Sequence, residues 1–196
     1  MDLVSLARNT FRAPDLAMRH LRALDLPLAA RWMALILSVA LSTLLTAMSL
    51  ALFPAGIPLV LVLLVQSPIQ FALLQLGGLA ICVFLLSSLG RMLGGRGDFA
   101  DSLLVVAWVQ LLYVVIQAAQ LVLMLVLPLV ASLFGMVATV IMFWITVRLV
   151  RALHGFSNSF LVFLGLLAGI LLAVFLLSFI AAVLGLIPEI PPELLQ

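Results

Sequence analysis

Of the chain's 196 residues, 67% are hydrophobic and 8% are charged, whereas soluble domains are about half apolar and a quarter charged. A water-soluble fold of this length cannot bury so much apolar side chain, so the class of soluble globular domains is excluded. The formal net charge of +2 comes from scattered arginines that form no continuous basic surface, which argues against nucleic-acid binding.

Residues 1–31 are predicted to form short amphipathic helices that lie on the cytoplasmic surface of the membrane. Pro14 ends the first helical pattern and begins the second. The apolar faces carry Leu3, Leu6, Ala7 and Thr10, then Ala17, Leu21 and Leu24. Arginines on the opposite faces suit anionic headgroups, with the leucines below them. A second interpretation is that these arginines act only as topology signals.

Five apolar stretches are long enough to cross a bilayer, because about 20 helical residues span about 30 Å of hydrocarbon. The predicted spans are residues 32–53, 69–90, 103–125, 129–150 and 157–184. The apolar segment 57–66 is predicted to be interfacial or re-entrant, and residues 185–196 to form a short proline-rich external tail. The sequence therefore predicts an all-α integral membrane protein with a domain of five spans over residues 32–184.

The arginines predict the orientation of the spans, because cytoplasmic flanks carry an excess of basic residues. All nine fall before the first span, between the second and third, or between the fourth and fifth, and the connections at 54–68 and 126–130 carry no charge. The N-terminus is therefore predicted to be cytoplasmic and the C-terminus external. Seven arginines are candidates to face lipid headgroups: Arg8, Arg12, Arg19, Arg22, Arg31, Arg148 and Arg151.

The third span carries an intramembrane polar stripe. At about 100° per residue, its four polar side chains lie within about 80° of one another. They are Gln110, Tyr113, Gln117 and Gln120. Because lipid cannot satisfy an amide, we expect the stripe to face protein or water. Hydrogen bonds between helices and a path for a polar substrate are the two interpretations, and the absence of an ionisable group favours the first.

Small residues recur at four-residue spacing in two spans, which is typical of closely packed membrane helices. The first span has Ala34, Ser38, Ser42 and Thr46, and the fifth has Gly165, Gly169 and Ala173. Packing within one chain is the preferred interpretation. A homodimer through the fifth span, or packing against another membrane protein, is the alternative.

The loop LGGRGDFADS, residues 93–102, contains an Arg-Gly-Asp tripeptide of the kind displayed by cell-adhesion ligands. Because Arg91 and Arg96 place this loop on the cytoplasmic side, we interpret it as a hinge. Gly94, Gly95 and Gly97 are expected to turn the chain, and Asp98 or Asp101 to cap the next helix.

The sequence contains no recognisable motif for catalysis or for binding a metal or a cofactor. A lysine of the phosphate-loop type does not follow the glycines, and neither GxSxG nor HExxH occurs. Cys82 is alone, and His20 and His154 are expected to be headgroup or loop histidines without partners. We therefore predict no enzyme activity, no cofactor and no metal site.

Taken together, the five spans, LGGRGDFADSLLVVAW after the second span and RALHGFSN after the fourth resemble the Yip family of Ypt/Rab-interacting membrane proteins. The N-terminal FRAPDLAMRHL is similar to the lead-in of bacterial members. The landmark that matches the family is the loop Gly94, Gly95, Arg96, Gly97, Asp98 and Phe99. Arginine in place of every lysine is typical of a GC-rich bacterial genome, which predicts the bacterial inner (plasma) membrane as the location.

The resemblance implies a non-enzymatic membrane protein that shapes a membrane or binds lipids and partners. Eukaryotic relatives bind Rab-type GTPases through a long cytosolic region, and the short segment of about 31 residues here argues against that partner. A small transporter or lipid-handling protein that uses the polar stripe is one alternative. An accessory subunit of a larger membrane complex is another.

Overall fold

The computed structural model describes residues 3–53 and 67–185, and every structural statement below refers to these. The predicted interfacial or re-entrant segment 57–66 and all of the predicted tail after Gly185 lie outside the described residues.

Every element in the described part of the chain is a helix. Two short helices, α1 (Leu3–Arg12) and α2 (Pro14–Ala23), precede five long ones. The long helices are α3 (Leu28–Leu52), α5 (Pro68–Met92), α6 (Phe99–Val126), α7 (Pro128–His154) and α8 (Ser159–Val183). Each of these five is long and apolar enough to cross a membrane, which confirms the prediction of five helices that are candidate spans.

Local signals set several helix ends where the sequence predicts them. Pro14, Pro68 and Pro128 occupy the first turns of their helices, where a missing N–H costs nothing. Gly155, with φ 72°, ends α7 in the left-handed conformation. By contrast, α3 begins four residues before the predicted span, at Leu28, and so includes Arg31 in its first turn.

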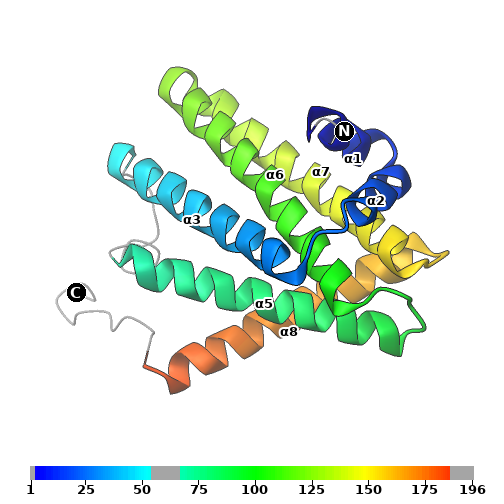
Figure 1. Ribbon diagram of the computed structural model, residues 1–196. Helices are drawn as coiled ribbons and strands as arrows, with labels where there is room; N and C mark the ends of the chain where they lie inside the picture. The colour runs from blue at the N-terminus through cyan, green and yellow to red at the C-terminus, as the bar shows by residue number, and fades with distance from the viewer. Residues whose placement is uncertain (1–2, 54–66, 186–196) are drawn as a thin grey trace.

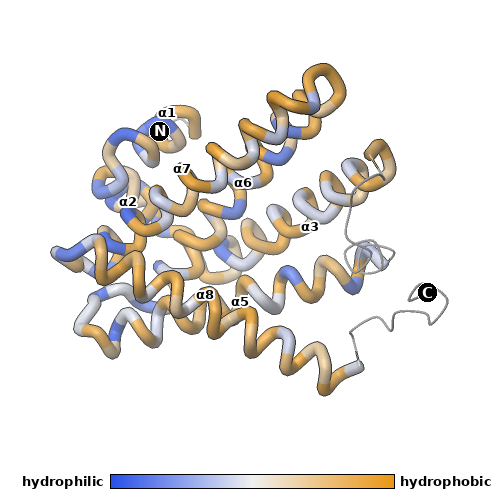
Figure 2. The backbone as a smooth tube through the Cα atoms, turned by 180° about the vertical axis from the view of Figure 1, so that it is seen from behind, coloured by the Kyte–Doolittle hydropathy of each residue, from blue (hydrophilic) through white to orange (hydrophobic). Residues whose placement is uncertain are grey.

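The five long helices form a splayed bundle (Figure 1). Helix α6 lies between α3 and α7 and also contacts α5, while α8 packs against α5 and α7. Loops and helix ends with charged residues gather at one end of the bundle, together with α1 and α2 (Figure 2). We call this the charged end and define it by Arg22, Arg31, Asp98, Asp101 and Arg151.

The apolar faces of α1 and α2 were predicted to lie in lipid, but their central residues instead pack against α6 and α7, while Leu3 and Leu24 stay exposed. Leu6 of α1 and Ala17, Met18 and Leu21 of α2 are buried in one core with residues of those two spans. The residues from the spans are Leu104, Val105, Trp108, Val109, Leu112, Met142, Ile145, Leu149 and Leu153. An amphipathic face is satisfied by any apolar surface, so its periodicity could not distinguish protein from lipid.

Candidate functional site at the charged end

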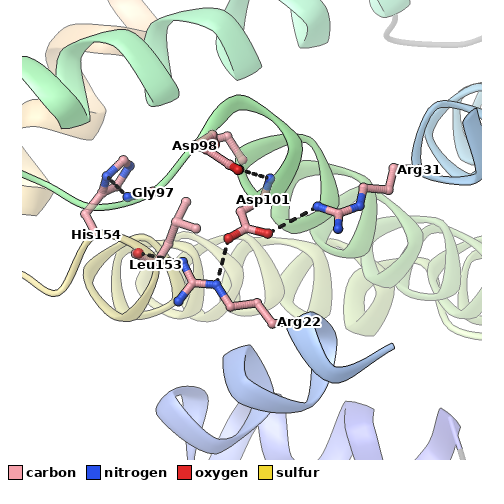
Figure 3. A network of polar contacts seen from close by, with 8 residues as sticks. Arg22, Arg31, Gly97, Asp98, Asp101, Leu153 and His154 are labelled. Carbon is pink, nitrogen blue, oxygen red and sulfur yellow. Dashed lines mark hydrogen bonds and ion pairs between the residues drawn. The ribbon is translucent and has the colours of Figure 1, made fainter. Parts of the chain in front are cut away.

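Asp101 of α6 is the centre of an ion-pair network that joins four helices (Figure 3). Its carboxylate accepts a hydrogen bond from Arg22 Nε of α2 at 2.7 Å and from Arg31 Nη1 of α3 at 3.2 Å. Arg22 Nη2 also donates to the Leu153 carbonyl of α7 at 3.1 Å. The side chains of Arg31 and Asp101 are only 10% and 19% exposed, so these charges are held largely away from solvent.

Asp98 caps α6, as the sequence predicts. Its Oδ1 accepts a hydrogen bond from the backbone N–H of Asp101 at 2.7 Å, which satisfies one of the donors that a helix start leaves unpaired. Asp101 was the alternative cap, but its carboxylate pairs with the two arginines instead. The two acids three residues apart therefore have different roles.

His154, expected to be a headgroup or loop histidine, is instead the last residue of α7 and only 2% exposed. Its Nδ1 accepts a hydrogen bond from the Gly97 N–H at 3.3 Å, and its carbonyl accepts one from the Arg96 N–H at 3.1 Å. The two segments that carry the family resemblance, LGGRGD and RALHGF, are therefore packed together.

The glycines around His154 are required by the closeness of the ring. A Cβ at Gly90, Gly95 or Gly97 would overlap with His154 atoms, and one at Gly94 would meet nothing within 4 Å. Of these four glycines, only Gly94 has a positive φ, of 85°. The hinge interpretation is therefore correct for Gly94, whereas Gly95 and Gly97 lack side chains because the imidazole fills that space.

The Nδ1 hydrogen bond assigns the tautomer of the neutral ring. Because Nδ1 accepts from Gly97, the proton of a neutral imidazole lies on Nε2, which becomes a donor. The buried Nε2 has no hydrogen-bond partner in the described residues. Nε2 packs against α5 at Gly90, beside the Leu86 carbonyl, whose interaction with the ring falls outside regular hydrogen-bond geometry.

The seven arginines predicted to face lipid differ in their surroundings. Arg8, Arg12 and Arg19 are exposed and form no ion pair with another described residue. Arg22 is tied to Asp101, and Arg151 pairs with Asp15 at 3.4 Å. Arg148 is half-buried. Arg31 is 8% exposed and enclosed by the Asp101 pair, so its side chain does not face lipid as expected.

The polar stripe of α6 lies against two other spans. Ser42 Oγ of α3 donates to Gln117 Oε1 at 2.8 Å, and Gln75 Nε2 of α5 donates to Ser42 Oγ at 3.2 Å. The side-chain amide of Gln120 packs directly against Gly135 of α7, and a Cβ on Gly135 would overlap with this amide. Gln110 and Tyr113 are half-buried, and Tyr113 packs against the core of α6 and α7.

A cavity of about 640 Å³ separates the charged-end halves of α5 and α8. Gly165 and Gly169 line it, and a Cβ on either would meet nothing within 4 Å. The expectation that these glycines bring two helices of the chain into close contact is therefore wrong for them, although Ala173 is 4% exposed. A smaller cavity of about 250 Å³ lies between α3 and α6 beside Gln117 and Gln120.

Several residues of these sites were missed from the sequence. Gln75 lies in an apolar span without a polar stripe like that of the third span, and His154 has no partner nearby in the chain. Periodicity within one helix cannot report a contact between residues 42 and 75 or 97 and 154. The one available signal was the run of glycines at 90, 94, 95 and 97, which indicates crowding as well as turning.

A model of a protein family described as Yip1 domain matches residues 8–181. No curated protein and no solved structure matches the chain. The matched range includes the second half of α1, all of α2 and four complete spans, and it ends two residues before α8 does. Both segments around His154 lie within it.

Proposed function

The chain belongs to the Yip1-domain family, and from this we propose that it is a non-enzymatic multi-pass membrane protein that organises a membrane or binds partners there through its charged end. The observation that carries the proposal is the docking of α1 and α2 on α6 and α7. Through this packing, α1 and α2 hold Arg8, Arg12 and Arg19 on the surface of the bundle, and we call these two helices the α1–α2 layer.

The position of this layer along the bundle fits a membrane–water interface. Helix α6 has 28 residues and is about 42 Å long, about 12 Å more than the hydrocarbon thickness. Trp108, which donates a hydrogen bond from Nε1 to Thr10 Oγ1 at 3.0 Å, lies about 14 Å from the start of α6. Helix α1 therefore docks near the depth at which hydrocarbon gives way to headgroups, where amphipathic helices bind.

The exposed side chains of α1 and α2 suit an anionic lipid surface. Arg8, Arg12 and Arg19 are free of ion pairs with described residues, and Leu3, Val4 and Phe11 are 66%, 72% and 47% exposed. Basic residues near an anionic leaflet contribute about 1 kcal/mol each. We assign this layer to the cytoplasmic leaflet of a bacterial inner membrane, with the C-terminus outside, on the positive-inside rule.

The lipid interaction is tested with spin-labelled lipids in proteoliposomes. Replacing Arg8, Arg12 and Arg19 with glutamine is expected to abolish the preference of the protein for labelled phosphatidylglycerol over labelled phosphatidylcholine. The matched control replaces Arg91 and Arg96, which lie at the same end of the bundle outside α1 and α2. If the control removes the preference equally, net charge is responsible and the α1–α2 layer has no special role.

The orientation is tested separately with a topology reporter. A reporter fused after Gln196 is expected to be active only outside the cytoplasm. Activity restricted to the cytoplasm would exclude the orientation with five spans.

A transporter is the second candidate function, and the cavity beside Gln117 and Gln120 favours it. Replacing Gln110, Gln117 and Gln120 with leucine distinguishes the two. Normal folding with lost substrate flux would support transport, whereas unchanged flux with impaired assembly would support a purely structural stripe.

A further inference from the structure

We propose that the cavity of about 250 Å³ between α3 and α6 is a water-filled pocket inside the membrane, entered from one side only. Its entrance lies at the end of the bundle opposite the charged end (Figure 1). We call this the far end and define it by Leu52 of α3 and Val126 of α6. The inference rests on the proposed function, which places α3 and α6 in a bilayer, and it gives the second candidate function the side from which a polar solute would enter.

The residues that line the pocket extend from the far end to about the middle of the two spans. At a rise of about 1.5 Å per residue, Ser49 lies about 4.5 Å and Thr46 about 9 Å from the end of α3. On α6, Met124, Gln120 and Gln117 lie about 3, 9 and 14 Å from its end. The pocket therefore reaches the surface of the bundle at the far end and leads inward from there.

The polar side chains of the pocket have hydrogen-bonding groups to spare. Gln117 accepts from Ser42 Oγ through Oε1 at 2.8 Å, and its Nε2 donates to no described residue. The Gln120 amide and the Ser49 hydroxyl form no hydrogen bond within the described part of the chain. Thr46 donates to the Ser42 carbonyl at 2.9 Å, which leaves the Thr46 oxygen free to accept. Hydrocarbon offers neither donors nor acceptors, so these groups require water.

The pocket has both the space and the partners that water requires. One water needs about 15 Å³ of cavity volume and about two to four polar partners. The pocket is many times larger than this, and four of its lining residues are polar. None of its lining residues is ionisable, so it holds no fixed charge that would select an ion in place of water.

The pocket is closed toward the charged end. Its inner limit is Ser42, which is bonded to Gln117 and also accepts from Gln75 Nε2 of α5 at 3.2 Å. Leu35 lies about 10 Å closer to the charged end than Ser42 does. It belongs to a core of α3, α5 and α6 whose buried members are 0–3% exposed: Leu35, Val83, Leu103 and Ala107. Water that enters at the far end therefore stops at the hydrogen bonds of Ser42.

Cysteine accessibility of the full chain in membrane vesicles tests the pocket. Cys82, the single native cysteine, is first replaced by serine. Ser49→Cys, Thr46→Cys and Gln120→Cys are then made one at a time and treated with MTSET, a cationic thiol reagent that does not cross bilayers. A thiolate is the reacting form and arises only where water reaches the sulfur, so we expect modification at least about tenfold faster than at lipid-facing positions.

Matched controls carry the thiol at a similar depth on the lipid-facing side. They are Met48→Cys for Ser49→Cys, Leu44→Cys for Thr46→Cys and Val122→Cys for Gln120→Cys, at positions that are 44%, 57% and 62% exposed. Thr46→Leu adds apolar bulk to the pocket and should slow the modification of Gln120→Cys to the rate of Val122→Cys. Leu44→Phe, on the lipid-facing side, should leave that rate unchanged.

Two further positions test access from one side. Arg96→Cys lies in the exposed loop at the charged end and should react only in vesicles of the orientation in which the pocket thiols do not. Ser38→Cys lies between Ser42 and the charged end at a position that is 0% exposed, and it should react in neither orientation.

The outcomes distinguish this proposal from the proposed function. Slow reaction of the pocket thiols, equal to that of the lipid-facing controls, would overturn the water-filled pocket and leave the membrane function intact. Reaction from the same side as Arg96→Cys, or reaction of Ser38→Cys, would overturn access from the far end alone. Rapid reaction of the lipid-facing controls as well would show that α3 and α6 do not lie in hydrocarbon, and both proposals would fail.

Discussion

The α6–α7 half and the α5–α8 half of the bundle are both strongly apolar in sequence, α8 most of all, but they are packed in different ways. Helices α6 and α7 share a continuous core that α1 and α2 cover. Helix α8 buries only Val162, Ala173 and Ala181, and a cavity separates much of it from α5. The closely packed half therefore forms the scaffold, and the open half leaves space that lipid can fill.

The difference shows what stabilises helix contacts in an apolar solvent. Lipid chains are as apolar as leucine, so burial of apolar area alone does not hold two spans together. The α6–α7 half has ion pairs, a buried Trp108–Thr10 hydrogen bond and close glycine contacts. The α5–α8 contact relies on Gly77 and Gly78 against Leu177 and has few polar contacts to add. The ion pairs, the glycine contacts and the hydrogen bonds can each be removed separately by substitution.

The largest loss of stability is expected when the ion pairs of Asp101 are broken. Asp101→Ala leaves Arg31 buried without its partner and should lower the free energy of unfolding by about 3 kcal/mol, measured by denaturant titration in mixed micelles. Asp98→Asn is the matched control, because it also removes one acidic charge from the start of α6 but keeps an acceptor for the Asp101 N–H. Equal losses in both variants would show that helix-end charge, and not the pairs, is responsible.

The second effect compares a glycine that contacts the closely packed half with a glycine that contacts nothing: Gly90 of α5 lies against His154 of α7, whereas Gly165 of α8 faces the cavity. Gly90→Ala places a methyl group against the enclosed ring of His154 and should cost about 2 kcal/mol in the same titration. Gly165→Ala, in the open half, meets nothing within 4 Å and should leave the stability unchanged or slightly higher. A similar loss for both would contradict the proposed difference in packing.

A third, smaller effect is expected where α1 docks. Thr10→Val removes the acceptor of the buried Trp108 N–H and should lower the stability of the docked state by about 1 kcal/mol. Hydrogen exchange of residues 3–12 should then be faster. Thr139→Val is the control, because the Thr139 hydroxyl is exposed and bonds only within α7, to the Gly135 carbonyl. Unchanged exchange in Thr10→Val would exclude this bond as the anchor of α1.

The smallest effect is expected at the polar stripe. Gln117→Leu combined with Ser42→Ala in a double-mutant cycle should give a coupling energy of about 0.6 kcal/mol. Gln110→Leu, on the same face of α6, should show no coupling to Ser42, because no hydrogen bond joins the two in the structure. Coupling of equal size at both positions would mean that the stripe acts through α6 as a whole.

Much of the fold could be read from local signals. Each apolar stretch had the length of a span, Pro68 and Pro128 marked helix starts, and Asp98 was recognisable as a cap from its place before an apolar run. These features depend on residues within a few positions of one another, so one sequence is enough to show them. The candidate sites depend on longer separations and could be predicted only in part.

His154, Asp101 and Gln75 show why the remainder was not predictable. Each makes its decisive contact with a residue far away in the sequence: Gly97 of the α5–α6 loop, Arg22 of α2 and Ser42 of α3 respectively. In a helix that is apolar on all sides, periodicity does not show which face meets protein and which meets lipid. The sequence around a single polar residue in such a helix is therefore the same whether the side chain is hydrogen-bonded to another helix or exposed.

By itself, the sequence determined that this is an all-α protein with five stretches that can cross a membrane, because helix length and apolar content depend on composition alone. Only the tertiary structure decided that α1 and α2 pack on the bundle, that three glycines make room for an imidazole and that two spans separate around a cavity. Lipid and protein interiors are equally apolar, so the choice between them depends on shape and on hydrogen-bond geometry, which exist only once the helices are placed together.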